Sequence, residues 1–341
     1  MSPRARLRAW WLSRLPLTDS WTLTQGNIYI VPTKAGLVFV GPSPQTLDLF
    51  GDKAKARALA TRLGVPVLPG TGGATTLEEA QAFFQSQQGG PGGEAAVMIK
   101  AVAGGGGRGM RVVQEESELA RAYATAKAEA EAAFGQGDLY LERYLTGMRH
   151  VEIQVLADHY GNAIYLGERD CSIQRRHQKI IEEGPSPAVN ADLRARMGQA
   201  AISGVQAIGY TNAGTMECLL GPDGRFYFME MNTRIQVEHP VTELISGVDL
   251  VAEQIRIAAG EKLRFRQRDL SFRGHAIECR INAEDPYTFV PSPGKISFYH
   301  PPGGPGIRVD SHIYQGYTIP SHYDSMVAKV IAYGDSRDQA I

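Results

Sequence analysis

Cysteine is scarce in this chain of 341 residues. Its three cysteines, Cys171, Cys218 and Cys279, stand far apart without a CxxC pair, so the sequence predicts neither a disulfide framework nor a zinc knuckle. No apolar run approaches the roughly 20 residues that a membrane-spanning helix needs. An excess of charge is also absent, since the formal net charge is −1, which gives no global attraction to nucleic acid or acidic membranes. We therefore expect a cytoplasmic protein with neither nucleic acid nor membrane as a partner.

Two common nucleotide-binding motifs are missing as well. The run Gly104–Gly107, which Arg108 and Gly109 follow, lacks the GK[ST] end of a Walker A loop and the helix and acidic partner of a Rossmann fingerprint. Four successive glycines can still form a flap whose bare amides close on phosphate oxygens. A plain hairpin loop is the alternative, and the glycines alone favour it.

The most informative stretch is Glu230–Pro240. If it is extended, its polar side chains point to one face, and these are Glu230, Asn232, Arg234, Gln236 and Glu238. A straight segment of this length would span roughly 26 Å at about 3.3 Å per residue, too long to surround a single ion. It must therefore curl or contact successive parts of a long substrate, with oxygen ligands at one end and an arginine and a carboxylate at the other.

The preceding residues predict a hairpin. Gly214–Leu220 and Arg225–Asn232 flank a turn-forming Gly-Pro-Asp-Gly sequence. Pairing the two residues next to the turn sets Glu217 opposite Phe228, so Glu217 and Glu230 become diagonal neighbours on one face, about 7 to 8 Å apart. Carboxylates without histidine or cysteine favour Mg²⁺ or Mn²⁺ and hence phosphoryl transfer. A solvated hairpin with two exposed acids is the alternative.

At this point the sequence resembles a known family. GTMECLLGPDGRFYFMEMNTRIQVEHPVTE is similar to the metal and bicarbonate segment of biotin carboxylases, the ATP-grasp components of acetyl-CoA, propionyl-CoA and pyruvate carboxylases. Its second part, RIQVEHPVTE, is the specific one, because other ATP-grasp ligases share the two acids and the asparagine only. The resemblance runs from about Leu37 to the last residue. It implies an α/β (α+β) ATP-grasp fold with a mobile glycine-rich lid and a partial biotin carboxylase C-terminal subdomain.

The resemblance also implies a domain organisation, and the chain is long and hydrophobic enough for two or more lobes. We expect an ATP-grasp domain over residues 37–265, with a lid at about 72–144, and a truncated C-terminal subdomain over 266–341. Residues 1–36 do not resemble the family, whose N-terminal nucleotide-fold subdomain should precede Leu37. They are read either as a basic amphipathic segment or transit peptide, or as the product of a misplaced start or a frameshift. We expect such a chain, in isolation, to bind MgATP weakly, to self-associate through exposed apolar surface and to have little or no biotin-dependent carboxylation.

Lysines and a set of pocket residues match the family's nucleotide site. Lys53 stands in the first turn of a helix that Asp52 caps, where a cation is unfavourable by about 0.3 to 1 kcal/mol, so an anionic partner is expected. A tolerated surface lysine is the alternative. By resemblance Lys53 and Lys100 contact ATP phosphates, and Arg143 replaces a lysine that acts through its main chain. The other residues that the resemblance places at the nucleotide are Gly105, Gly106, Gly107, Glu142, Leu145, His150, Gln174, His177, Gln178, Leu219, Gln236 and Val237.

The same resemblance implies the chemistry. Bicarbonate attacks the ATP γ-phosphate to give carboxyphosphate, whose CO₂ passes to biotin on a biotin carboxyl carrier protein; a carboxyltransferase acts next, for example in fatty acid biosynthesis, and the family is commonly homodimeric. The residues that match the family's metal site, which holds two Mg²⁺ or Mn²⁺ ions, are Glu217, Glu230 and Asn232. Those that match its catalytic positions are Lys179 near bicarbonate, Arg234 as its clamp, Glu238 as the base and Arg280 beside biotin.

Two alternatives remain open. One is a different bicarbonate-using ATP-grasp ligase of the carbamoyl-phosphate-forming type, against which RIQVEHPVTE argues. The other is a truncated, inactive ATP-binding remnant.

Overall fold

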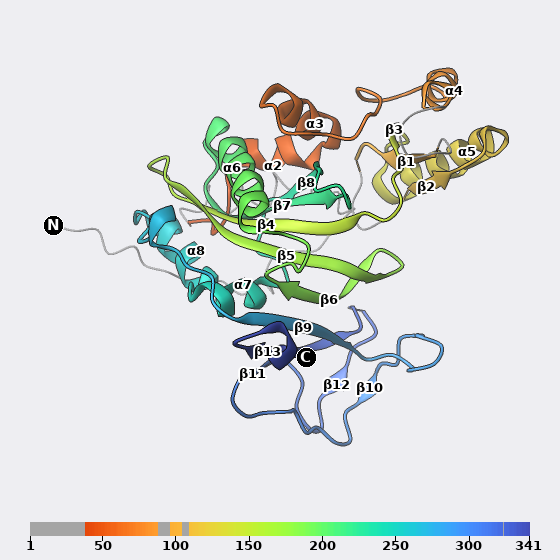
Figure 1. The fold of residues 1–341 in the computed structure, drawn as a ribbon. Coiled ribbons are helices and arrows are strands. Elements are labelled where there is room, and N and C mark those ends of the chain that lie inside the picture. Colours follow the sequence, from red (N-terminus) through yellow and green to blue (C-terminus); the bar gives the residue numbers. More distant parts are fainter. Residues whose placement is uncertain (1–37, 88–95, 104–108, 323) are drawn as a thin grey trace.

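The structure is a computed structural model that describes residues 38–87, 96–103, 109–322 and 324–341. The N-terminal segment 1–36 and the glycines Gly105, Gly106 and Gly107 therefore lie outside the described residues. Within them the chain is a mixed α/β protein with a large, a small and a two-stranded antiparallel sheet, the last formed by residues 294–295 and 318–319 (Figure 1). Residues 38–41 form no strand although they are part of an apolar run, and Val38 and Val40 are exposed.

The large sheet has eight strands in the order β11-β13-β9-β6-β5-β4-β7-β8. All neighbouring strands in it are antiparallel. The strands are β4 (Arg149–Ala157), β5 (Ala163–Arg175), β6 (Gln178–Gly184), β7 (Asn212–Leu220), β8 (Phe226–Asn232), β9 (His275–Asn282), β11 (Ile307–Ser311) and β13 (Met326–Gly334). Because β9 pairs with β6, the sheet crosses the expected boundary between residues 265 and 266, and that division remains a proposal.

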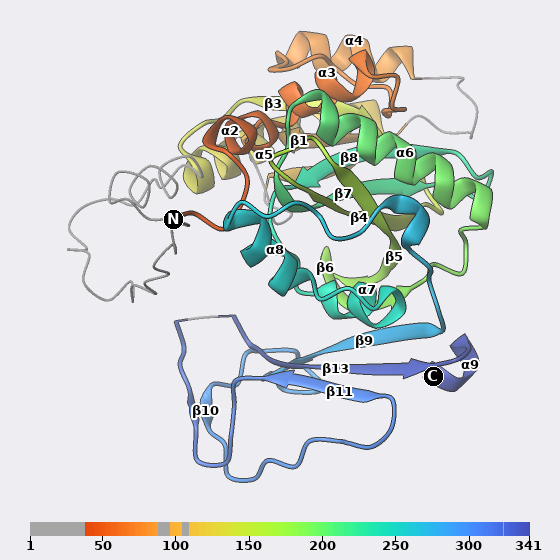
Figure 2. The ribbon, with the colours of Figure 1, turned by 90° about the vertical axis from the view of Figure 1, so that its left-hand side faces the viewer.

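Helices cover both faces of the sheet (Figure 2). α3 (Lys53–Arg62) and α6 (Ala191–Ala207) pack on one face, and α7 (His239–Ser246) and α8 (Leu250–Ala258) on the other. Strand β4 alternates between the two: its valines and Ile153 enter the α6 core, so Glu152 and Gln154 point to the α7 side. The alternation thus places polar side chains under α7.

The hairpin of β7 and β8 has a different register from the expected one. Arg225 belongs to the turn, because its carbonyl accepts a hydrogen bond from Gly221 N–H (2.8 Å), and Leu220 therefore pairs with Phe226. A bulge at Met229 then shifts the ladder by one residue and sets Glu217 directly opposite Glu230. The shared face of the two acids is confirmed, but the diagonal spacing is wrong.

The small sheet has the order β2-β1-β3 and its own core. It lies beside the large sheet, at the right of Figure 1. Its strands are β1 (Val97–Ala101), β2 (Met110–Val113) and β3 (Leu139–Arg143), and its helices are α4 (Leu77–Ser86) and α5 (Glu116–Phe134). All of these elements fall inside the stretch 72–144 that the sequence assigns to a lid, an assignment that remains a proposal.

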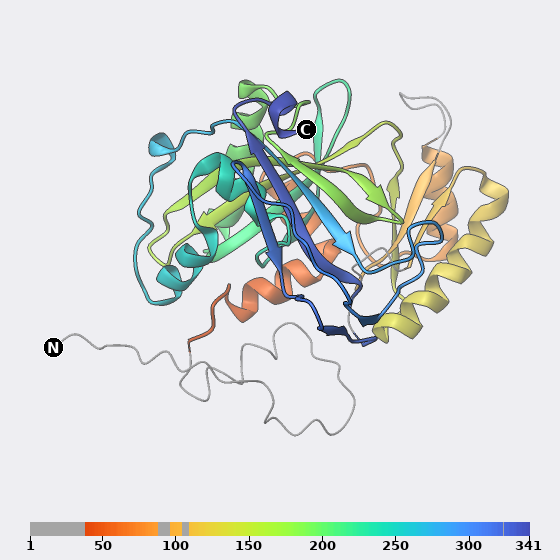
Figure 3. The ribbon, with the colours of Figure 1, turned by 90° about the horizontal axis from the view of Figure 1, so that it is seen from below.

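The remaining elements are short. Figure 3, in which the molecule is seen from below, shows the blue C-terminal strands running side by side in front of the rest of the large sheet, with the C-terminus near their end. The short elements are α2 (Pro44–Gly51), the 3₁₀ helix η2 (Gln267–Asp269), β10 (Gly294–Lys295), β12 (Thr318–Ile319) and α9 (Arg337–Ala340). In the part of the chain that the structure describes, every helix is too short or too polar to cross a membrane.

Candidate active site

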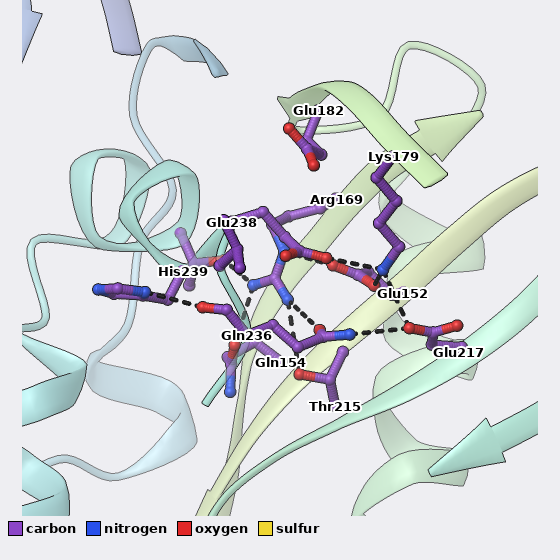
Figure 4. A network of polar contacts seen from close by, with 12 residues as sticks. Glu152, Gln154, Arg169, Lys179, Glu182, Thr215, Glu217, Gln236, Glu238 and His239 are labelled. Carbon is purple, nitrogen blue, oxygen red and sulfur yellow. Dashed lines mark hydrogen bonds and ion pairs between the residues drawn. The ribbon is translucent and has the colours of Figure 1, made fainter. Parts of the chain in front are cut away.

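Polar side chains gather on the α7 side of the large sheet, where β4, β5, β6 and β7 lie next to one another (Figure 4). Apart from Lys179, which is partly buried, all of them are buried. The set comprises Glu152, Gln154, Arg169, Lys179, Thr215, Glu217, Gln236 and Glu238. Buried polar groups are costly unless they are paired, so this cluster marks a functional site.

Arg169 on β5 organises the floor of the site. Its side chain is completely buried, and its Nε donates to Glu152 Oε1 at 2.6 Å. Its two terminal nitrogens donate to Gln154 Oε1 and Gln236 Oε1, both at 2.9 Å, and one of them also donates to Thr242 Oγ1 at 2.7 Å. Because Gln236 accepts from Arg169 through its oxygen, its amide nitrogen is free to donate to Glu217 Oε1, at 2.8 Å. The arginine thereby fixes which way Gln236 faces.

Lys179 on β6 joins three carboxylates. Its Nζ donates to Glu152 Oε2 at 2.6 Å, to Glu238 Oε1 at 2.7 Å and to Glu217 Oε1 at 2.9 Å. Burial alone would raise the pKa of Glu152, but the charges of Arg169 and Lys179 lower it to about 2. Burial would likewise lower the pKa of Lys179, and the surrounding carboxylates raise it instead. Glu152 and Lys179 therefore both stay charged at neutral pH.

Glu238 stands between two cations. Its Oε1 accepts from Lys179, and its Oε2 accepts from Arg280 of β9 at 3.0 Å. Arg234, expected beside Glu238, is not brought there: its side chain is exposed, and its guanidinium donates to the carbonyl of Ile235 at 3.1 Å. The reason is that the chain is extended only as far as Asn232 and then turns into α7, so the expected alternation ends. The role of Arg234 remains a prediction.

The residues predicted to bind metal come together. Glu217 and Glu230 face each other across the hairpin, and Asn232 Nδ2 donates to Glu217 Oε1 at 2.8 Å. Burial would raise the pKa of Glu217, but His150 and Lys179 lower it, so its oxygens are available as anionic ligands. Two carboxylates and an amide oxygen are the donors that Mg²⁺ or Mn²⁺ prefers. The donor set therefore fits such ions.

The two candidate phosphate lysines lie on different elements, one on a helix that packs on the large sheet and the other on the small sheet. Lys53 begins α3, and its Nζ is 3.4 Å from Glu230 Oε2, so a carboxylate supplies the expected anionic partner at this helix end. Lys100 on β1 donates to Glu142 Oε2 of β3 at 2.5 Å, and Arg57 of α3 contacts the other oxygen of the same carboxylate. Glu142 thus links the small sheet to α3 through a buried side chain.

The other predicted nucleotide residues differ in their exposure and in their distance from the site. His150 lies among site residues, with Nδ1 2.9 Å from Gln174 Nε2 and Nε2 2.9 Å from Glu217 Oε2. Burial acts to lower the pKa of His150, but the Glu217 carboxylate raises it overall. His177 and Gln178 are exposed at the β5–β6 turn, where His177 has a left-handed φ of 64°. Like His150 and Gln174, four further members of the predicted set are half-buried, namely Arg143, Leu145, Leu219 and Val237.

Sequence reasoning missed several residues of the site. Glu152 and Gln154 are polar positions that alternate with the apolar residues of β4, so the same period-two signal that singled out the hairpin acids was present there. Arg169 lies on the same strand as Gln174, which the resemblance places at the nucleotide, but was itself given no role. The other residues that sequence reasoning missed are Thr215, Thr242, Glu182, Glu278 and Lys329.

Comparisons with known proteins agree with this geometry. The family described as carbamoyl-phosphate synthase L chain, ATP binding domain, matches residues 52–266, and the biotin carboxylase C-terminal domain matches residues 278–341. A biotin carboxylase from Nostoc sp. is 55% identical over 306 residues, which cover 89% of this chain and 67% of that protein. One from Pseudomonas aeruginosa is 54% identical over 308 residues, covering 90% of this chain and 68% of that protein.

Solved structures give the same result. The biotin carboxylase β-γ-ATP complex from Campylobacter jejuni has a TM-score of 0.88 at 46% identity, covering 93% of this chain and 70% of that one. The biotin carboxylase domain dimer of Hydrogenobacter thermophilus 2-oxoglutarate carboxylase was solved with MgADP, ADP and bicarbonate. It has a TM-score of 0.87 at 48% identity, covering 92% of this chain and 68% of that one.

The fold and the facing acids define an ATP-grasp ligase, as the sequence predicted. The match to the C-terminal domain, which includes Arg280, narrows that class. The chain belongs to the biotin carboxylase family.

Proposed function

We propose that this chain carboxylates biotin on a biotin carboxyl carrier protein, using ATP and bicarbonate and passing through carboxyphosphate. The observation that carries the proposal is the position of Glu238. Its carboxylate lies between Lys179 and Arg280, and Lys179 also contacts Glu217 of the metal-fitting pair. The carboxylate of Glu238, a potential base, is thereby placed between the phosphoryl-transfer site and Arg280.

The first step needs compensation of phosphate charge. Lys53, next to Glu230, and Lys100, on the small sheet, are cations on either side of the nucleotide, each held by a carboxylate before ATP arrives. Glu217, Glu230 and Asn232 would hold Mg²⁺ or Mn²⁺, which supplies charge stabilisation to the transferring phosphoryl group. The chain's own task is to orient these acids, which the hydrogen bonds of Asn232 and Gln236 to Glu217 support.

The base acts on bicarbonate. An oxygen of bicarbonate forms a bond to the γ-phosphorus as the bond to ADP breaks, and Glu238 takes the bicarbonate proton. Lys179, fixed by Glu152 and Glu217, stays beside Glu238 and attracts the anionic substrate. Carboxyphosphate then breaks its C–O bond to give CO₂ and phosphate. The ureido nitrogen of biotin loses its proton to this phosphate and forms a bond to CO₂, with Arg280 beside the developing negative charge.

A carbamoyl-phosphate-forming ligase is the competing function, since the match over residues 52–266 carries that description. The C-terminal match favours biotin, because it contributes Arg280 to the site. We further propose that the chain acts as a homodimer, as in the solved dimer, and that a carboxyltransferase uses its product.

The test is a bicarbonate-dependent ADP release assay on the purified chain with MgATP, run with free biotin and separately with ammonium. We expect biotin to stimulate ADP release and to become labelled by ¹⁴C-bicarbonate, and ammonium to have no effect. Stimulation by ammonium with no labelling of biotin would assign the competing function.

A further inference from the structure

Two glutamates behind Arg280 are unusual among the described residues. Glu182 on β6 and Glu278 on β9 are directly opposite each other in the ladder between these strands. Both side chains have 0% exposure. Glu182 Oε2 and both oxygens of Glu278 have no hydrogen-bond donor in the described part of the chain. Two ionised carboxylates in this arrangement would each lose hydration and repel the other.

Arg280 connects this pair to the catalytic base. Its Nε donates to Glu182 Oε1 at 2.6 Å, and its Nη2 contacts Glu238 Oε2 at 3.0 Å. The guanidinium is therefore held from behind by Glu182 and from the front by Glu238. Its orientation depends on Glu182 whenever Glu238 changes its charge.

The charged groups around the pair can be counted. Besides Glu182, those that act on Glu278 are Lys329 of β13, Arg280 of its own strand and Glu238 at the start of α7. Lys329 Nζ donates to Val237 O at 2.5 Å.

Other charged groups on the neighbouring helices are paired elsewhere. Arg337 of α9 donates to Glu183 at 2.6 Å, and Glu243 of α7 accepts from Arg308 at 2.8 Å. His239 of α7 contacts the carbonyl of Gln236. Arg280 and Lys329 are therefore the cations nearest the pair, although Lys329 Nζ is also 3.6 Å from Asp310 Oδ2 of β11 and Glu238 also contacts Lys179.

We propose that Glu182 is a positioning residue for Arg280 and that Glu182 and Glu278 together hold one proton at neutral pH, an inference that rests on the proposed role of Arg280 beside biotin. With that proton, the pair carries a single negative charge beside Arg280 and Lys329. When Glu238 accepts the bicarbonate proton, Arg280 loses one of its two anionic partners. Its positive charge is then available in the following step, in which the biotin ureido group becomes negative.

The acid–base properties of Glu182 and Glu278 agree with one shared proton. Burial raises the pKa of Glu278 to about 8, against the attraction of Lys329. Burial raises the pKa of Glu182 to about 7, against the attraction of Arg280. A second negative charge on the pair would cancel the positive charge that the reaction produces.

The first test needs no enzymatic activity. Infrared spectroscopy of the purified chain should show the C=O band of a protonated carboxylic acid that persists to about pH 7 to 8, although exposed glutamates ionise near pH 4.3. In Glu278→Gln the band should disappear, because Glu182 then pairs with Arg280 as a carboxylate. Absence of the band in the unmodified chain, or an unchanged band in the variant, would overturn the proposal.

The second test separates positioning from a structural role. In Glu182→Gln we expect about a tenfold loss of kcat/KM for biotin and little change in bicarbonate-dependent ADP release without biotin. In the unmodified chain the biotin-dependent rate should fall above about pH 8, where the pair loses its proton. In Glu278→Gln this fall should be absent. Equal losses with and without biotin would indicate a structural role and contradict the proposal.

Glu253→Gln is the matched control. Glu253 of α8 is also a buried carboxylate, 1% exposed, paired to Arg264 at 2.8 Å, and its loss should leave the infrared band and the biotin dependence unchanged. An unmodified chain that shows the band but no bicarbonate-dependent ADP release would refute the proposed function and leave the shared proton standing.

Discussion

Glu217 and Glu230 lie directly opposite each other across the β7–β8 hairpin because Met229 bulges out of β8. Without the bulge, the pairing of Leu220 with Phe226 would set Glu217 opposite Met229, and Glu230 would point into the α3–α6 core. The bulge lets Phe228 and Met231 both enter that core while Glu230 faces the site. One extra residue thus serves the packing of one face and the chemistry of the other.

The metal-fitting pair gives the first prediction. Glu230→Gln should raise the Mg²⁺ concentration needed for half-maximal ADP release and lower kcat by roughly 100-fold, the scale of losing one electrostatic contact to the reacting group. A Mg²⁺ titration of the bicarbonate-dependent rate measures both. Glu261→Gln, which changes an exposed carboxylate, is the control. An unaltered Mg²⁺ requirement in Glu230→Gln would refute the metal assignment.

Glu238 gives the second prediction. Glu238→Gln should keep MgATP binding and lose bicarbonate-dependent ADP release, because an amide of the same shape cannot accept the proton. Calorimetric titration with MgATP, alongside the ADP assay, separates the two properties. Parallel loss of binding and turnover would instead assign Glu238 a purely structural role between Lys179 and Arg280.

Arg169 gives a prediction about stability. Arg169→Lys should lower the free energy of unfolding by about 3 to 5 kcal/mol, since one ammonium cannot reach Glu152, Gln154 and Gln236 together and leaves buried polar groups unpaired. Urea denaturation measures the change. The conservative control is Arg196→Lys on the exposed face of α6, which should stay within about 0.5 kcal/mol. A similar small change at Arg169 would show that its contacts add little.

Glu278 gives a prediction about pH. Its pKa is about 8 in the folded chain against an ordinary value of 4.5, so between these values the folded state binds a proton that the unfolded state has released. The free energy of unfolding should therefore fall as pH rises through this window, by up to about 1.4 kcal/mol per unit. Glu278→Gln should lack this decline. Urea denaturation at several pH values compares the two, and parallel curves would contradict the raised pKa.

Much of the fold and part of the site could be predicted from sequence. The turn sequence after Leu220 predicted the hairpin, and alternation predicted that Glu217 and Glu230 share a face; both predictions hold. The resemblance predicted the ATP-grasp fold and the family, which the comparisons confirm. These features depend on local periodicity or on a long motif, and both are visible in one sequence.

The rest depended on information that is not local. The bulge at Met229 is set by packing against α3 and α6, so turn chemistry alone gave the wrong register. Arg234 was expected beside Glu238 because extended backbone was assumed beyond Asn232, yet the chain turns there. Arg280, which is 42 residues further along the chain than Glu238, contacts that carboxylate instead. Contacts between strands that are distant in the sequence produce no regular residue spacing, so they cannot be predicted from periodicity.

The pairing of β9 with β6 has a consequence for the way in which the chain unfolds. The two family matches are separated between residues 266 and 278. The sheet is continuous across this boundary, so we expect the two sides to unfold together. A chain cut there would expose the backbone groups along the outer edge of β6, and open edges pair with other copies. Amide hydrogens on β9 should exchange with deuterium as slowly as those on β6, because neither strand can open without breaking the ladder that holds Arg280 over Glu238.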